Sequence, residues 1–223
     1  MKVYVAIPCL DHISAKFTQC VLNLKAPKDT ELIYDLNVGT LVYHSRNELA
    51  ERAIASKAEY TLWLDADMTF MPYTLIDMFN TLRDNNLDIL CGMYYRRRHP
   101  WTPTLFSRFD IMEKAGIRSE EFTEIPEGLF EVAACGFGCV LMRTSVLMNV
   151  LVSHGPQFTP IGQVGEDISF CVRARKCHYK VWCDPSIALG HEVHTVITKS
   201  NREMFSNGND VKAQRLAERD YQI

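Results

Sequence analysis

The chain has 223 residues, of which 47% are hydrophobic, and its formal net charge is -3. This length and hydrophobic content allow a sizeable core, and we expect one domain over residues 1–194, followed by a polar tail with a short helix over residues 195–223. The absence of a basic excess excludes a general nucleic-acid binder. No apolar run could span a membrane, and most of the eight cysteines lie in apolar segments. We therefore expect a soluble, cytoplasmic protein with reduced thiols.

Apolar runs and stripes of helical period alternate along the first part of the chain. They predict strands at residues 3–7, 31–34, 60–64 and 88–95, a short extended piece at 41–43, and helices that end near Leu24, begin at Ser45 and begin at Pro72. Such alternation indicates an α/β fold of Rossmann-like type, with a mainly parallel central sheet and helices on both faces.

The helix at Ser45 is expected to start with a capping box, formed by Ser45 and Glu48. This start places Arg46 in the first helical turn, where the helix dipole disfavours a cation. Arg46 therefore either serves an anionic ligand such as a diphosphate or is an ordinary surface arginine.

The strand at residues 60–64 runs directly into Asp65 and Asp67. Because side chains at positions i and i+2 of an extended backbone point the same way, we expect both carboxylates to converge at the carboxyl edge of the sheet. Open α/β sheets bind ligands at that edge. Two carboxylates there suit Mg²⁺ or Mn²⁺ bridging to a diphosphate, although a pair of solvated carboxylates fits the pattern as well.

The segment 94–103 is the most basic and aromatic part of the chain, with arginines at 96, 97 and 98. It predicts either contacts to phosphates, bases or sugars, or a solvated turn. A strand at 104–109 follows, and then a charged excursion at 110–128 that suggests a hairpin. In the core segment 129–142, Gly136 and Gly138 indicate a bulge or the close approach of another group, such as a bound sugar.

The last part of the chain contains a helix at 144–152 and a loop at 153–165 rich in glycine and proline, typical of a mobile acceptor loop. Glu166 and Asp167 then stand at the start of a helix that continues to Lys176, where acids favour the helix dipole in any case. A strand at 179–184, closed by Pro185, precedes Gly190 and His191.

Taken in order, these motifs resemble family 2 glycosyltransferases, whose nucleotide-sugar domain has the GT-A fold. The segments that carry the resemblance are Val5–Pro8, Ser45–Asn47, Leu62–Asp67, Gly136–Gly138, Gly165–Asp167 and Gly190–His191. The resemblance implies a metal-dependent transfer of a sugar, a hexose or a pentose, from a nucleoside-diphosphate sugar to an acceptor hydroxyl.

The resemblance also implies roles for single residues. The residues expected to hold Mn²⁺ or Mg²⁺ are Asp65, Asp67 and His191. The residues expected to contact the donor are Asp65, Arg46, Pro8, Gly136 and Gly138. Asp167 is the expected catalytic base of an inverting transfer, with Glu166 beside it orienting the acceptor.

Other functions stay open at this point. A retaining GT-A transferase uses the same donor site, and a sugar-phosphate nucleotidyltransferase also uses acids and a metal, although residues 8–12 are not the glycine-rich phosphate loop it needs. A sugar or nucleic-acid binding module is the non-enzymatic alternative, but binding needs no base. The acceptor is a glycan, a protein or a modified DNA base, no membrane partner is expected, and the tail helix at 209–223 could join two chains.

Overall fold

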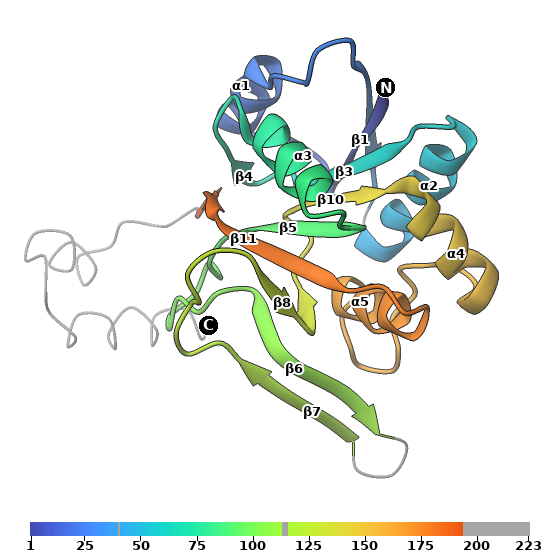
Figure 1. The fold of residues 1–223 in the computed structure, drawn as a ribbon, viewed down its shortest axis with the longest axis vertical. Helices are drawn as coiled ribbons and strands as arrows, with labels where there is room; N and C mark the ends of the chain where they lie inside the picture. The colour runs from blue at the N-terminus through green and yellow to red at the C-terminus, as the bar shows by residue number, and fades with distance from the viewer. Residues whose placement is uncertain (40, 113–115, 194–223) are drawn as a thin grey trace, which may run out of the picture.

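A computed structural model describes residues 1–39, 41–112 and 116–193 of the chain. Its centre is a 7-stranded sheet with the order β2-β1-β3-β10-β5-β11-β8 (Figure 1). The strands of this sheet are β1 (Lys2–Cys9), β2 (Glu31–Val38), β3 (Tyr60–Leu64), β5 (Ile89–Met93), β8 (Phe130–Val132), β10 (Cys139–Arg143) and β11 (Val181–Ala188). All run in one direction except β10 and β8, so the mainly parallel sheet that the sequence predicts is confirmed.

Helices cover both faces of the sheet, as expected. The helices on one face are α1 (Ala15–Asn23) and α3 (Thr74–Asp84), and those on the other are α2 (Val42–Ala55), α4 (Thr144–His154) and α5 (Glu166–Lys176). Alternation along β1 explains the two layers, because Val3 and Val5 join the core under α1 and α3, whereas Tyr4 and Ala6 join the core under α2. Within the described residues, no helix is both long and apolar enough to cross a membrane.

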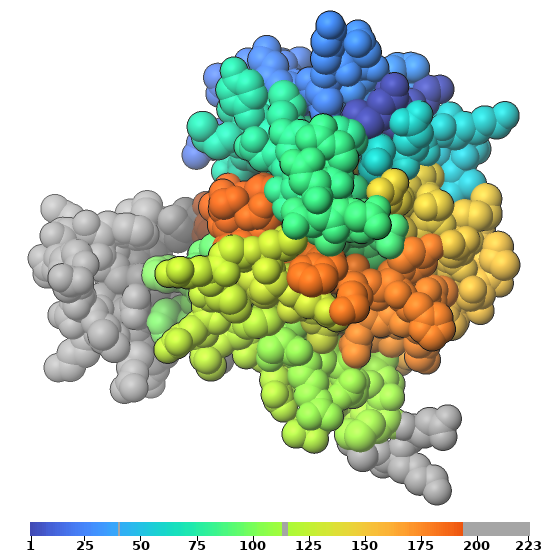
Figure 2. All heavy atoms as spheres, in the orientation of Figure 1, coloured from blue at the N-terminus to red at the C-terminus, as the bar shows by residue number. Residues whose placement is uncertain are grey.

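Two small sheets lie at the edges of the central one. In the first, β4 (Met68–Thr69) pairs with β12 (Gly190–His191). In the second, the order is β7-β6-β9, with β6 at Leu105–Met112, β7 at Gly116–Glu121 and β9 at Ala134–Cys135. The β6–β7 hairpin, which the sequence suggested, projects from the body of the molecule (Figure 2).

The start of α2 corrects the sequence analysis. The helix begins at Val42, after Leu41, and no side chain caps it, so the capping box at Ser45 and the extended piece at 41–43 are both wrong. The backbone N–H of Ser45 already donates to the carbonyl of Leu41, and Glu48 accepts a hydrogen bond from Asn37 instead of turning back to Ser45. The capping-box pattern at Ser45 did not determine the start of the helix, because the chain closes its first helical turn about one turn earlier.

The end of β11 also differs from the prediction. Pro185 does not close the strand, which continues to Ala188 after an irregularity between Asp184 and Ala188. A proline is tolerated there because the irregularity removes the ladder hydrogen bond that it could not donate. The predicted polar tail, including the helix at 209–223, lies outside the described residues.

Candidate active site

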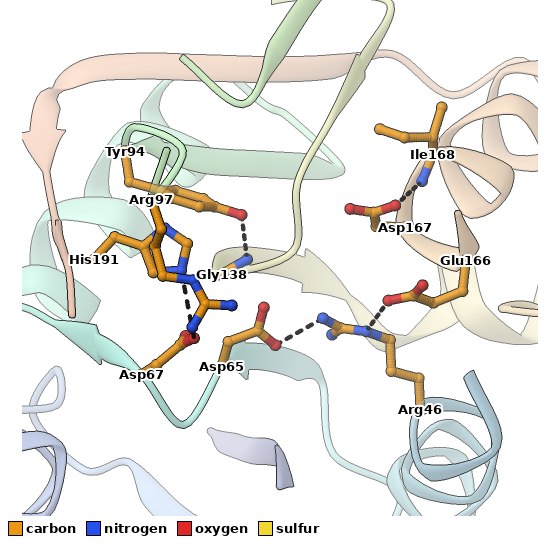
Figure 3. A network of polar contacts seen from close by, with 10 residues as sticks. All are labelled: Arg46, Asp65, Asp67, Tyr94, Arg97, Gly138, Glu166, Asp167, Ile168 and His191. Atoms are coloured by element: carbon orange, nitrogen blue, oxygen red, sulfur yellow. Dashed lines mark hydrogen bonds and ion pairs between the residues drawn. The ribbon is translucent and has the colours of Figure 1, made fainter. Parts of the chain in front are cut away.

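A cavity of about 530 Å³ opens at the carboxyl ends of β1 and β3, the edge at which open α/β sheets bind ligands. It gathers residues from distant parts of the chain. The predicted site residues among its lining are Pro8, Arg46, Asp65, Asp67, Glu166 and Asp167. The fold therefore brings most of the residues selected from the sequence to one place (Figure 3).

The two aspartates of the central motif do not converge as the extended backbone predicted. Strand β3 ends at Leu64, and the chain turns at once, with the N–H of Met68 donating to the carbonyl of Asp65 (3.1 Å). Asp65 consequently points to Arg46, whereas Asp67 points to Arg97 and His191 (Figure 3). The alternation argument failed because it needs a strand that continues through both residues.

Arg46 forms a buried ionic bridge across the site, and its side chain is only 2% exposed. Its Nη2 lies 2.7 Å from Asp65 Oδ1, and its Nε lies 3.1 Å from Glu166 Oε1. Burial alone would lower the pKa of Arg46, but the charges of Asp65, Glu166 and Asp167 raise it above its ordinary value. The guanidinium therefore stays charged, and it links the start of α5 to the end of β3.

Aromatic rings complete the surroundings of this guanidinium. The Cζ atom of Arg46 lies within 6 Å of three ring centroids, at 5.8 Å from Trp63, 5.4 Å from Phe137 and 5.8 Å from Phe158. Its Nη1 is buried without a hydrogen-bond partner in the described part of the chain. Arg46 was expected to contact the donor, and that role stays a prediction. The contacts that the structure provides for it are with the protein itself.

His191 reaches the site through the small β4–β12 sheet, which pairs it with Met68, the residue after Asp67. Its Nδ1 lies 2.9 Å from the carbonyl of Tyr95. Because a carbonyl can only accept, Nδ1 carries the hydrogen, and Nε2 faces Asp67 Oδ2 at 3.4 Å. A metal-binding histidine usually donates one ring N–H to an acceptor such as a backbone carbonyl, which leaves the other nitrogen for the metal, and His191 has such a carbonyl partner.

The residues around Asp67 fit a divalent ion in part. Arg97 Nη1 lies 2.9 Å from Asp67 Oδ2, so this oxygen already forms an ion pair with the guanidinium. Burial opposes ionisation of Asp67, but the neighbouring His191 and Arg97 lower its pKa. In the described part of the chain, no group of three His, Cys, Asp or Glu side chains lies close enough to hold a metal ion. Asp67 and His191 thus provide two side chains suited to a metal ion, whereas Asp65 is paired with Arg46.

Asp167 lies where this cavity meets a second one. The second cavity, of about 430 Å³, is also lined by Tyr94, Phe106 and the arginines at 96–98. Asp167 and Arg97 line both cavities. At the start of α5, Asp167 Oδ1 accepts a hydrogen bond from the N–H of Ile168 (2.7 Å), and burial raises the pKa of its carboxyl to about 6.

The glycines of the core segment meet a close neighbour, as expected, and that neighbour is Tyr94. A Cβ at Gly136 or at Gly138 would clash with the Tyr94 side chain, and the N–H of Gly138 donates to its hydroxyl (3.0 Å). The close approach that suggested a bound sugar is therefore made by the protein. Gly136 also lines the second cavity, and the donor contact assigned to both glycines stays a prediction.

Sequence reasoning did not place Tyr94, Arg97 or Glu192 beside the two aspartates, although it suggested that the segment 94–103 contacts phosphates, bases or sugars. Arg97 pairs with Asp67, and Glu192 lines the first cavity and accepts a hydrogen bond from Ser14 (2.8 Å). A signal for the first two was present, because they directly follow β5. The carboxyl ends of parallel strands share one edge, so a segment that leaves β5 lies beside Asp65 and Asp67.

Comparison with known proteins gives a family and a fold. The family described as glycosyl transferase family 2 matches residues 42–151, just under half of the chain. No curated protein sequence matches the chain significantly. The crystal structure of A197 from STIV is similar with a TM-score of 0.62 at 17% identity, covering 87% of this chain and 87% of that one.

The crystal structure of GalNAc-T7 with UDP, GalNAc and Mn²⁺ is similar with a TM-score of 0.60 at 11% identity. That similarity covers 87% of this chain and 43% of the other, and at such identities it concerns the fold alone. Residues 42–151 of this chain are thus similar to glycosyl transferase family 2, and the chain has the GT-A fold that its motifs predicted.

Proposed function

We propose that this protein transfers a sugar from a nucleoside-diphosphate sugar to an acceptor hydroxyl, with inversion at the anomeric carbon and Asp167 as the base. The observation that carries the proposal is the position of Asp167, which lines both cavities. A donor in the first cavity and an acceptor in the second would meet at its carboxylate. Its pKa of about 6 suits a base that works near neutral pH.

In the proposed reaction, Asp167, Arg97 and Arg46 have separate roles. The acceptor oxygen attacks the anomeric carbon while its proton passes to Asp167. The bond from that carbon to the diphosphate oxygen breaks, and its electron pair leaves with the diphosphate. Arg97, which lines both cavities, adds a positive charge beside this exchange. Arg46 fixes Glu166, the neighbour of Asp167, through their contact of 3.1 Å.

Asp67 and His191 would hold a divalent ion, Mn²⁺ or Mg²⁺, with Asp65 close by. Mg²⁺ commonly binds one or two protein carboxylates together with substrate phosphates and water, so two protein ligands are enough. Such an ion would neutralise the negative charge that develops on the leaving diphosphate.

The decisive experiment combines binding with turnover. The full chain is screened with nucleoside-diphosphate sugars with and without Mn²⁺, and both melting temperature and nucleotide release are measured. We expect one class of donor to raise the melting temperature in a Mn²⁺-dependent way and to be hydrolysed slowly. Paramagnetic resonance of Mn²⁺ should show bound ion with the parent protein and far less with Asp67→Ala.

Asp84→Ala is the matched control, because Asp84 is an exposed carboxylate at the end of α3 that pairs only with Arg83 among the described residues. Its Mn²⁺ binding and turnover should equal those of the parent. Unchanged Mn²⁺ binding by Asp67→Ala would contradict the metal site. A product that keeps the donor's anomeric configuration would contradict the inverting role of Asp167.

A further inference from the structure

The second cavity has a basic wall made by the loop that follows β5. Arg96, Arg97 and Arg98 all line this cavity. A β-bridge between Tyr95 and Pro103, and a hydrogen bond from the N–H of Arg96 to the carbonyl of Thr102 (3.0 Å), close the loop at its base. The three cations are therefore presented on a short loop that is held at both ends.

Two of these arginines already have counter-charges. Arg96 Nη2 lies 2.6 Å from Glu121 of β7, and its guanidinium lies over the ring of Phe106. Arg97 is paired with Asp67. Arg98 is exposed, and it has neither an ion pair nor a hydrogen bond with any residue that the structure describes. The cavity thus keeps one cation whose charge the described part of the protein does not neutralise.

We propose, on the basis of the function proposed above, that the acceptor is a phosphorylated sugar whose phosphate binds Arg98. The cavity of about 430 Å³ has room for a small phosphorylated sugar. The aromatic side chains of Tyr94 and Phe106 line it and can pack against the C–H face of a sugar ring. Asp167 lines the same cavity and can take the proton of the attacking hydroxyl.

The charge pattern favours a small phosphate ester over a nucleic acid. Binding a polynucleotide requires several cations along its backbone. The arginines of the neighbouring hairpin are instead neutralised locally, Arg108 by Asp110 at 2.7 Å and Arg118 by Glu120 at 3.4 Å. The net charge of the whole chain is -3. One unneutralised arginine beside a small cavity suits one phosphate group.

The test compares hexose 6-phosphates with the parent hexoses, using the full chain with Mn²⁺ and a nucleoside diphosphate. Isothermal titration calorimetry should give a dissociation constant at least about 10-fold lower for the phosphorylated sugar, because charge-assisted hydrogen bonds to phosphate are strong. In Arg98→Gln this preference should fall to about 2-fold or less. Arg118→Gln, which removes an exposed arginine of the hairpin, should keep the preference of the parent.

Equal affinities for the two sugars would overturn the proposal, as would a preference that Arg98→Gln leaves intact. Tighter binding of a single-stranded octanucleotide than of any hexose phosphate would overturn it in favour of a nucleic-acid acceptor. Donor hydrolysis by the parent chain without acceptor tests the proposed transferase activity separately from the proposed acceptor. Hydrolysis without any phosphate preference would reject the acceptor and keep the transferase, whereas a phosphate preference without donor binding would reject the transferase and keep the phosphate site.

Discussion

The effect of Asp167 on stability distinguishes its two possible roles, which are catalytic base and helix-start residue. Its pKa is about 6 in the folded chain against an ordinary 3.8, with burial as the largest cause. The folded state therefore holds the proton more tightly than the unfolded state. The resulting stability is complete below about pH 4 and is lost as the pH rises through 6. At neutral pH the ionised carboxylate lowers the free energy of unfolding by roughly 3 kcal/mol.

Asp167→Asn should consequently be more stable than the parent and much less active. We expect its free energy of unfolding, measured with urea, to exceed that of the parent by about 2–3 kcal/mol at pH 7.5 and by almost nothing at pH 4. Turnover should fall by roughly 10²-fold or more, because an amide cannot accept the proton of the acceptor.

Asp77→Asn is the control for the helix-start role, because Asp77 is an exposed acid in the first turn of α3. It should lose under about 1 kcal/mol of stability and no activity. A destabilised Asp167→Asn that keeps its turnover would leave Asp167 as a helix-start residue only.

For single residues, the sequence predicted which side chains would be in the site better than it predicted their contacts. Asp65, Asp67 and Asp167 could be selected because each is a carboxylate at the end of a strand or the start of a helix. The partners of Asp65 and Asp67 could not be foreseen, since they depend on the turn after Leu64, which redirects both side chains. The burial of Arg46 was equally hidden, because it follows from packing against residues far away in sequence.

The β4–β12 pair shows how an element can control a ligand. Gly190 lies opposite Thr69, and a Cβ at Gly190 would overlap Thr69 Oγ1. The following residue, His191, is thereby held beside Asp67. The Gly-His pair of the motif is therefore a packing requirement as well as part of the proposed metal site.

Gly190→Ala should weaken Mn²⁺ binding, because the added methyl group pushes β12 away from β4 and moves the imidazole of His191. We expect a loss of about 10-fold or more in affinity, measured by paramagnetic resonance, similar to the effect of disturbing a residue that positions a ligand. The double variant Gly190→Ala with Thr69→Ala removes the overlapping oxygen and should recover most of the affinity. If the single variant bound Mn²⁺ like the parent, His191 would not be a ligand.

Among the elements, long periodic segments were predicted well and boundaries less so. Helices α3, α4 and α5 and strands β1, β3 and β5 lie where the apolar patterns indicated. The segment 129–142, by contrast, was read as one core stretch, and it forms β8, β9 and β10, which belong to two different sheets. Which strand pairs with which depends on contacts between distant residues, so local patterns could not reveal this division.

Seen as a whole, the molecule joins its early and late segments through Arg46. This residue lies on α2 and contacts both Asp65, at the end of β3, and Glu166, at the start of α5. Asp65 and Arg46 lie inside the family match over residues 42–151, and Glu166 lies beyond it. The two halves of the proposed site are thus connected by one buried cation.

Arg46→Met should destabilise the whole protein, because it leaves two carboxylates without their buried partner. Removing one member of a buried ionic group typically lowers the free energy of unfolding by about 3–5 kcal/mol, which urea denaturation would measure. Arg83→Met, which breaks an exposed pair with Asp84, should change stability by less than about 1 kcal/mol. Equal stability of Arg46→Met and the parent would show that Arg46 does not hold the halves together and would return it to a donor-binding role alone.

At the scale of the whole molecule, only some of the predictions are confirmed. The α/β class and the resemblance to family 2 glycosyltransferases are confirmed, and both rest on the order of many motifs along the chain. The single domain over 1–194 and the cytoplasmic location stay predictions, as does pairing of chains through the tail. They rest on composition and on local patterns, neither of which specifies contacts.

Strand β10 is the only strand of the central sheet that connects β2-β1-β3 with β5-β11-β8. A chain leaving the ribosome therefore cannot join β3 to β5 until Cys139–Arg143 has emerged, although β3 and β5 were made much earlier. Until then the edges of β3 and β5 carry unpaired backbone groups that can pair with other chains. The N–H of Asp65 also lacks its partner, the carbonyl of Gly138, until this stage, so the geometry of the site depends on a strand that is made after both of its neighbours.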